Sequence, residues 1–257
     1  MSTQPAGHAS HSRLVVVHPD AVVLAEAVAS RLVTRILDVQ SVRRPVHVVL
    51  TGGTVGIASL AALARHPVRD AVDWTGVHVW WGDERFLPAG DPERNETQAR
   101  EALLDHLPQL PAENVHPMPA ADAAASPEDA ATAYAVTLAA HAAEGEAVPA
   151  FDVLLLGMGP DGHVASLFPG HPGLDVTGVP TTGVHGSPKP PPERVTLTFE
   201  SIAAAHQVWV VAAGAEKASP VAAALAGAPV RETPAAGVAG TERTLWLLDA
   251  AAAGTSA

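Results

Sequence analysis

The stretch FDVLLLGMGPDGH, residues 151–163, is the part of the sequence that decides the fold. It begins with a mostly apolar run at residues 151–156, and such a run before a turn is typical of a strand that is buried on both faces. Glycine and proline then predict a turn over residues 157–162, which ends in an Asp-Gly-His corner. A strand of this kind indicates a parallel sheet that is covered by other elements on both sides.

Strand and helix signals alternate on either side of this stretch. Apolar runs predict strands at residues 14–18, 46–50, 77–81, 195–198, 207–212 and 245–248, with a short strand beginning near 115. Helical patterns lie at residues 20–40, 54–66, 94–107, 127–144 and 215–225, and the proline- and glycine-rich residues 169–192 predict a long loop. The alternation predicts an α/β fold, doubly wound, with a mostly parallel sheet and helices on both faces. Ligands bind such sheets beyond the carboxyl ends of the strands, so motifs that follow strands are candidates for a site.

The composition excludes several classes of protein. The 257 residues carry 27 acidic and 15 basic side chains, and this net charge of −12 argues against binding to nucleic acid. The absence of cysteine excludes disulfides and thiolate chemistry, and it fits a cytoplasmic location. No stretch reaches the roughly 18 apolar residues of a membrane span. We expect one α/β domain over residues 13–249, a disordered N-terminal tail at residues 1–12 and a flexible C-terminal tail at residues 250–257.

A glycine pair joins the predicted strand that ends at Leu50 to the helix that follows. The sequence there is Thr51-Gly52-Gly53-Thr54. Glycines at such a junction let backbone N–H groups approach an anion, and the helix N-terminus adds partial positive charge. Gly52, Gly53 and Thr54 are therefore candidates for binding a phosphate, and the alternative is an ordinary strand-to-helix turn. The lysine of a Walker loop is missing, so the motif does not indicate a nucleotide.

Three charged residues, Asp83, Glu84 and Arg85, follow the predicted strand that ends at Trp81. Charges near a core are costly unless they pair or bind something. Arg85 is suited to hold a phosphate or carboxylate with two hydrogen bonds, and Asp83 is a second candidate for a catalytic role. The alternative is a solvated loop whose charges pair with one another.

The Asp-Gly-His corner is the candidate for catalysis. Asp161 is placed to orient the His163 ring and raise its basicity, which leaves the other ring nitrogen free to take a proton. Residues 157–162 also match the dinucleotide fingerprint G-x-G-x-x-G. However, Pro160 interrupts the turn, and no acidic residue follows at the usual spacing. We therefore expect no nucleotide cofactor.

Lysine occurs twice in the chain, at Lys189 and Lys217. Lys217 lies at the start of a predicted helix, where its charge opposes the helix dipole, and a bound anion would explain that position. The alternative is a surface neighbour of Glu216. Lys189 and Arg194 flank three prolines that would hold them stiffly. An acidic protein that binds an anion needs a local cationic cluster of this kind.

Other chemistries lack their sequence signals. There is no G-x-S-x-G motif, so a serine hydrolase is disfavoured. No H-x-H or H-E-x-x-H spacing indicates a metal, so we expect no metal-ligand cluster.

Taken together, these residues resemble the 6-phosphogluconolactonase family. The resemblance rests on Thr51-Gly52-Gly53-Thr54, Trp81-Gly82-Asp83-Glu84-Arg85, Asn95-Glu96, the segment from Gly157 to Pro169, the segment from Ser187 to Thr196, and Gly214-Ala215-Glu216-Lys217. The order and spacing fit from about Arg13 to Leu248. The chain departs from the pattern at Val55-Gly56, where many relatives carry a Ser-Thr-Pro-like sequence, and we expect the backbone contacts of this loop to be kept.

The resemblance implies a fold similar to glucosamine-6-phosphate deaminase and ribose-5-phosphate isomerase. It also implies hydrolysis of 6-phospho-D-glucono-1,5-lactone to 6-phospho-D-gluconate in the oxidative pentose phosphate pathway, without metal or nucleotide. By matching positions, His163 would be the general base that activates water and Asp161 would orient it. The glycine loop, Arg85, Arg194 and Lys217 would hold the phosphate or nearby oxygens, with Arg85 our choice for the oxyanion.

Two alternative functions stay open. A sugar-phosphate isomerase or deaminase of the same fold would carry an acidic residue a few positions after the Asp-Gly-His corner, but none occurs until Asp175. A sugar-phosphate sensor that regulates transcription would need an N-terminal DNA-binding domain, for which the residues before Arg13 are too few. We expect the partner to be a phosphorylated sugar lactone, with no nucleic acid or membrane, in a monomer or small homo-oligomer.

Overall fold

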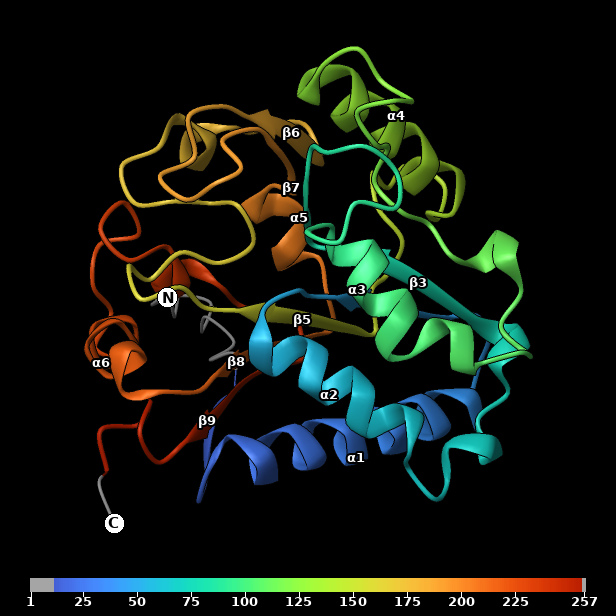
Figure 1. Cartoon of the computed structure of the whole chain (residues 1–257), viewed down its shortest axis with the longest axis horizontal. Helices are drawn as coiled ribbons and strands as arrows, with labels where there is room; N and C mark the ends of the chain where they lie inside the picture. The colour runs from blue at the N-terminus through green and yellow to red at the C-terminus, as the bar shows by residue number, and fades with distance from the viewer. Residues whose placement is uncertain (1–11, 256–257) are drawn as a thin grey trace, which may run out of the picture.

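The computed structural model describes residues 12–255, which contain a six-stranded, entirely parallel sheet (Figure 1). Its strands are β1 (Ser12–His18), β2 (Val46–Leu50), β3 (Val77–Trp81), β5 (Val153–Gly157), β8 (Gln207–Ala212) and β9 (Arg243–Asp249). Their order across the sheet is β1-β9-β8-β5-β2-β3. The central strands are apolar along nearly their whole length because both of their faces are buried.

One face of this sheet is covered by α1 (Ala21–Gln40), α2 (Thr54–Ala64) and α3 (Asn95–Ala102) (Figure 1). Helix α1 begins where the carboxylate of Asp20 accepts hydrogen bonds from the first free backbone N–H groups. Its buried stripe, which includes Leu32 and Ile36, belongs to the same core as Leu245 and Leu247 of β9. Burial of this stripe holds the helix against the sheet.

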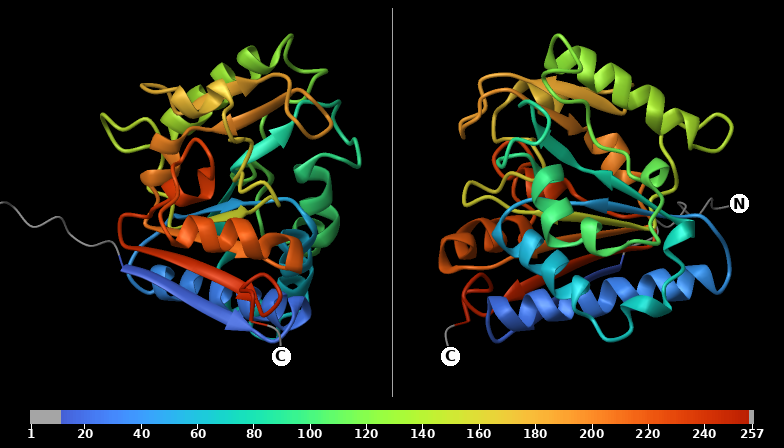
Figure 2. Two further views of the ribbon diagram at one scale, coloured as in Figure 1. Left: turned by 90° about the vertical axis from the view of Figure 1, so that its left-hand side faces the viewer. Right: turned by 45° about the vertical axis from the view of Figure 1, so that its right-hand side comes forward.

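The other face carries a smaller antiparallel sheet and three more helices. The sheet has the order β4-β7-β6, and Figure 2 shows this layer on the opposite side of the main sheet from α1. Its strands are β4 (Asp83–Arg85), β6 (Thr181–Val184) and β7 (Arg194–Leu197), and the helices are α4 (Pro127–Ala140), α5 (Phe199–Ala203) and α6 (Ala218–Leu225). The buried hydroxyl of Tyr134 in α4 bonds both the N–H and the carbonyl of Trp81, and so ties this layer to the end of β3.

The order of the strands creates a crevice between β2 and β5. From β2 the chain moves outward to β3, then returns to place β5 on the other side of β2 and continues to β8 and β9. Loops that leave β2 and β5 therefore diverge at their carboxyl ends. Ligands of open α/β sheets bind at such a switch point, and both the glycine loop and the Asp-Gly-His corner begin there.

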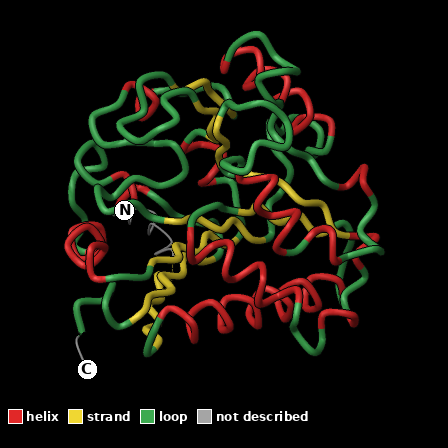
Figure 3. Tube along the Cα trace, viewed as in Figure 1, coloured by secondary structure: helices red, strands yellow, loops and turns green. Residues whose placement is uncertain are grey.

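The doubly wound α/β fold with helices on both faces is confirmed, but several details differ from the prediction. The segment predicted as an unbroken loop, residues 169–192, contains β6, although the chain between β5 and β7 is mostly loop (Figure 3). The strand predicted at 195–198 belongs to the small antiparallel sheet as β7, whose partner β4 is a charged segment. Apolar periodicity cannot detect a strand such as β4, which is short and formed by Asp, Glu and Arg.

The structure describes only part of the predicted chain ends. Most of the N-terminal tail, residues 1–11, lies outside the described residues, and the predicted domain start is one residue away from the start of β1 at Ser12. Residues 250–255, expected as part of a flexible tail, form a turn in which Ala252 is fully buried and its N–H donates to Asp249. No helix within residues 12–255 is long and apolar enough to span a membrane.

Candidate active site

A cavity of about 690 Å³ lies at the carboxyl ends of β2, β5 and β8. Of the predicted site residues, it is lined by Gly52, Gly53, Thr54, Asp83, Arg85, His163 and Lys217. These residues come from four separate segments of the chain, which the parallel sheet brings to one edge. Asp161 lies beside His163, and Arg194 is not part of the cavity wall.

The N-terminus of α2 forms one wall of the cavity. Gly53 is the N-cap residue, with φ 79°, and no side chain caps the helix. The hydroxyl of Thr51 accepts a hydrogen bond from the N–H of Gly157 at 3.0 Å, which fixes the ends of β2 and β5 to each other. The free N–H groups and the helix dipole favour an anion at this point.

Gly52 packs directly against the side chain of Asn95. A Cβ atom at residue 52 would lie 1.9 Å from Asn95 Oδ1, and the Asn95 amide is itself held by hydrogen bonds to the backbone carbonyl and carboxylate of Asp83. The glycine is therefore required for close approach rather than for a positive φ. Asn95 has no room to move without breaking its contacts to Asp83.

We expect Gly52→Ala to displace the glycine loop and lower both stability and activity. Overpacking of this kind costs about 1–3 kcal/mol, and the loss of kcat/KM should exceed that of the matched variant Gly82→Ala. A Cβ at Gly82 comes no closer than 3.8 Å to any neighbour. Thermal unfolding measures the stability of both variants, and steady-state kinetics measures their kcat/KM. Equal behaviour of the two variants would contradict the steric argument.

The Asp-Gly-His corner adopts the geometry of an oriented base. His163 Nδ1 lies 2.5 Å from Asp161 Oδ1, so Nδ1 carries the proton and Nε2 is the free nitrogen. The ring packs against Phe168, and it passes so close to Gly159 that a Cβ there would lie 2.1 Å away. Although burial alone would raise the pKa of Asp161, the hydrogen bond and charge of His163, with Lys189, hold that pKa well below its usual range. Asp161 therefore stays ionised beside the ring.

Lys189 also lines the cavity, next to the Asp161–His163 pair. Its Nζ lies 3.5 Å from Asp161 Oδ1 and 3.5 Å from His163 Nδ1. The sequence singled out Lys189 as part of a cationic cluster but did not place it in the site. The rarity of lysine was the available signal: the chain has two lysines, and the structure places both of them at this cavity.

Arg194 occupies a different place from the one predicted. Its guanidinium donates hydrogen bonds to the backbone carbonyls of Lys189, Pro190 and Pro191, and its side chain is 6% exposed. These bonds hold the proline loop that presents Lys189, while Nη1 of Arg194 lies 4.0 Å from Asp83 Oδ2. A contact between Arg194 and substrate therefore stays a prediction, because a cation next to a binding motif and a cation that supports the motif look the same in sequence.

Asp83 and Arg85 reach the cavity from β4. The carboxylate of Asp83 is buried and accepts hydrogen bonds from Ser166 Oγ at 2.7 Å and from the Asn95 amide at 3.3 Å. These hydrogen bonds hold the Asp83 carboxylate in place, and Asp83 in turn fixes the Asn95 amide beside the cavity. Arg85 donates to the backbone carbonyl of Glu93, which positions its guanidinium at the cavity edge.

Lys217 faces the cavity just before α6. Its side chain is 17% exposed, and the nearest carboxylate, that of Glu216, is 4.0 Å away. Burial lowers the pKa of Lys217, and the charge of Lys189 lowers it further, while Glu216 opposes the shift. An anion bound between Lys217 and the N-terminus of α2 would relieve that cost.

One group of residues contradicts the expectation that the chain has no metal-ligand cluster. His78, His116 and His141 come from three different elements, and their ring nitrogens lie within 4.8 Å of one another. Sequence spacing could not find them, because metal motifs of the short-spacing kind have their ligands on one helix or turn. They lie outside the cavity.

The chain is similar to proteins of one family. A family described as glucosamine-6-phosphate isomerases/6-phosphogluconolactonase matches residues 19–246. The 6-phosphogluconolactonase of Streptomyces coelicolor is 58% identical over 93% of each chain, and that of Mycobacterium leprae is 48% identical over 94% of this chain and 98% of its own. The solved 6-phosphogluconolactonase of Trypanosoma brucei is 31% identical, with a TM-score of 0.82 over 96% of this chain and 100% of its own. A monomeric glucosamine-6-phosphate deaminase, 18% identical with a TM-score of 0.76, shares the fold over 95% of this chain and 100% of its own.

Proposed function

Because the chain belongs to the glucosamine-6-phosphate isomerase/6-phosphogluconolactonase family, we propose that its cavity hydrolyses a phosphorylated sugar lactone with His163 as the general base. The reaction is the hydrolysis of 6-phospho-D-glucono-1,5-lactone to 6-phospho-D-gluconate in the oxidative pentose phosphate pathway. The chain is accordingly a carboxylic ester hydrolase. The observation that carries the assignment of roles is the His163–Asp161 pair, which lies in a cavity lined by both lysines.

In the proposed first step, His163 Nε2 takes a proton from a water molecule whose oxygen attacks the lactone carbonyl carbon. The attack turns the carbonyl oxygen into an oxyanion, which Arg85 would stabilise from the cavity edge. Asp161 keeps the ring in the required tautomer and stabilises the imidazolium that forms. Collapse of the oxyanion breaks the bond from the carbonyl carbon to the ring oxygen, and that oxygen takes the proton from the imidazolium and leaves as a hydroxyl.

The phosphate of the substrate would bind where Lys217 and the N-terminus of α2 line the cavity. Lys217 and the free N–H groups at the N-terminus of α2 form a suitable anion site. The phosphate is remote from the reacting carbon, so its binding energy serves to orient the ring over His163. Gly52 and Gly53 give the phosphate access to the backbone.

The isomerase and deaminase alternative finds less support in the residues of the site. Ring opening and isomerisation would use an acidic residue shortly after the corner, and residues 164–174 contain none. A purified sample should therefore release 6-phosphogluconate from the lactone faster than the lactone hydrolyses spontaneously. Turnover of glucosamine 6-phosphate or of an aldose phosphate in place of the lactone would contradict the proposal.

The proposed chemistry needs no metal ion. A δ-lactone is an activated ester, so one oriented base and a positioned substrate suffice. We expect that dialysis against EDTA leaves kcat and KM unchanged, measured by lactone hydrolysis before and after treatment. Loss of activity that a single divalent ion restores would show that a metal takes part.

The location and assembly of the protein belong to the same proposal. A cytoplasmic enzyme is supported by the absence of cysteine and by the place of the reaction in central carbohydrate metabolism. We propose a monomer or small homo-oligomer that binds no nucleic acid, consistent with the net charge of −12.

A further inference from the structure

Three histidines meet at the end of the main sheet that is remote from the cavity. His78 lies near the start of β3, His116 follows the 3₁₀ turn Ala112–Asn114, and His141 is the C-cap of α4. The cavity lies at the opposite, carboxyl ends of the strands. His78 lies three residue steps before the end of β3 at Trp81, about 10 Å along a strand.

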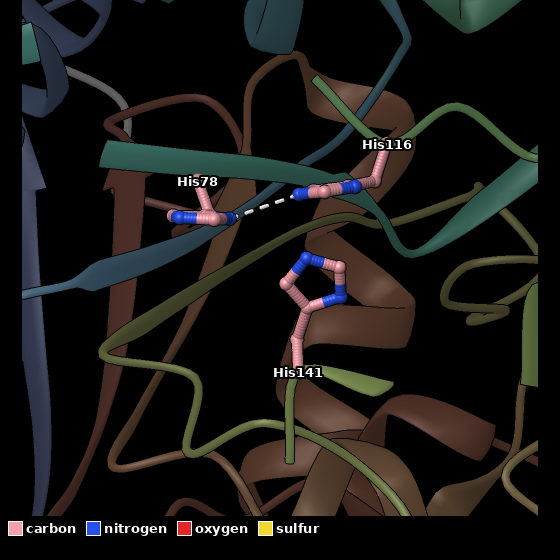
Figure 4. A group of neighbouring side chains, drawn as sticks. All are labelled: His78, His116 and His141. Carbon is pink, nitrogen blue, oxygen red and sulfur yellow. Dashed lines mark hydrogen bonds between the residues drawn. The ribbon is translucent and has the colours of Figure 1, made fainter. Parts of the chain in front are cut away.

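The three rings point their nitrogens at a common centre (Figure 4). His78 Nδ1 and His116 Nε2 are 2.9 Å apart, and Figure 4 shows a ring nitrogen of His141 directed toward this pair. Tetrahedral zinc with Zn–N bonds near 2.0–2.1 Å separates its nitrogen ligands by about 3.3 Å. The pair must therefore open by only a few tenths of an ångström to take an ion in place of its shared proton, and that proton has a second ring nitrogen to move to.

The tautomer of His141 is already that of a metal ligand. Its Nδ1 lies 2.9 Å from the backbone carbonyl of Thr137, which can only accept, so Nδ1 carries the proton and Nε2 has the free lone pair. Metal-bound histidines commonly donate their second N–H to a carbonyl in this way. The hydrogen bond also fixes the ring in place.

Neighbouring rings pack against His78 and His116. The His116 ring stacks on Trp80 at 3.9 Å between centroids, and Trp80 in turn donates its Nε1–H to His47. His116 is buried, and its ring also stacks on that of His78 and meets that of His141 edge-on. Neutral imidazoles in a fixed arrangement are suited to a transition metal and not to Mg²⁺ or Ca²⁺, which prefer oxygen.

We propose that His78, His116 and His141 bind one Zn²⁺ ion, or a similar divalent transition metal, with water at the fourth position. His116 is buried, whereas His141 is partly exposed and leaves the open position accessible. The ion would join β3 of the main sheet to the end of α4 in the second layer. Its role is to stabilise the contact between the layers, since it is remote from the cavity in which the lactone reacts.

The test compares metal binding by the wild-type chain and by His141→Ala, after treatment with EDTA and removal of the chelator. Wild type should bind about one Zn²⁺ per chain, and Co²⁺ should give the visible absorption of a tetrahedral site. Free Zn²⁺ at 100 times its Kd should raise Tm by about 5 °C or more. His141→Ala removes a partly exposed ring, so it should fold but lose the tetrahedral spectrum and most of the Tm shift.

A control variant and a second ligand variant distinguish loss of the metal site from a general effect of removing a histidine. His106→Ala removes an exposed histidine outside the group and should keep both effects. His116→Asn removes the central ligand and should abolish binding even if its Tm without metal is lower. The proposal is overturned if wild type binds no stoichiometric ion, or if His141→Ala responds to Zn²⁺ as wild type does. Lactone hydrolysis by the same samples, unchanged by Zn²⁺, reports separately on the proposed function.

Discussion

His163→Ala lowers kcat for the phosphorylated lactone by at least about 10²-fold, as expected when a general base is removed. The substitution takes away the nitrogen that receives the proton of water and leaves the cavity otherwise lined as before. The anion site that we propose at Lys217 and α2 does not include His163, so the affinity for the product 6-phosphogluconate should change little. A loss confined to kcat, at constant ligand affinity, is typical of a group that acts in the transition state.

Asp161→Asn provides the matched variant for this experiment. An amide keeps the shape of the side chain but cannot stabilise the imidazolium, so its kcat should fall between those of wild type and His163→Ala. Steady-state kinetics corrected for spontaneous hydrolysis, together with calorimetric titration of 6-phosphogluconate, give both quantities. A near-normal kcat for His163→Ala would remove this residue from the mechanism, whatever the behaviour of Asp161→Asn.

The parts of the site that the sequence predicted share one physical property: each follows a buried strand. The glycine loop follows β2 and the Asp-Gly-His corner follows β5, and Gly214 to Lys217 come after β8. An apolar run on both faces of a strand specifies a parallel sheet, and a parallel sheet brings the carboxyl ends of its strands to one edge. The convergence of these three segments at one edge of the sheet therefore follows from the pattern of residues along the chain.

The parts that were missed depend on contacts between distant segments. Arg194 supports the loop that presents Lys189, and the small sheet pairs charged β4 with β7, which follows that loop. The histidine group combines β3, a turn and the end of α4. Local periodicity and short spacings describe only neighbours in the chain, so such arrangements follow from tertiary packing alone.

Lys217→Ala should show whether Lys217 binds the phosphate of the substrate or acts at the reacting carbonyl. Lys217 lines the same cavity as the N-terminus of α2, and burial lowers its pKa, so its charge is costly without a bound anion. Its removal deletes one charge-assisted hydrogen bond, worth roughly 1.5–3 kcal/mol. That loss corresponds to a decrease of about 10- to 150-fold in kcat/KM for the phosphorylated lactone. Unphosphorylated gluconolactone has no group for Lys217 to hold, so its kcat/KM should fall far less.

The second lysine of the chain is the matched control for this measurement. Lys189 lines the same cavity but stands 3.5 Å from Asp161 and His163, so we expect Lys189→Ala to reduce kcat/KM by similar factors for both lactones. Wild type and both variants are compared on both substrates, with correction for spontaneous hydrolysis. A substrate-dependent loss in Lys217→Ala, beside a substrate-independent loss in Lys189→Ala, is the expected pattern. Equal losses on the two lactones in Lys217→Ala would place this lysine at the reacting carbonyl or in the fold, and would contradict the phosphate assignment.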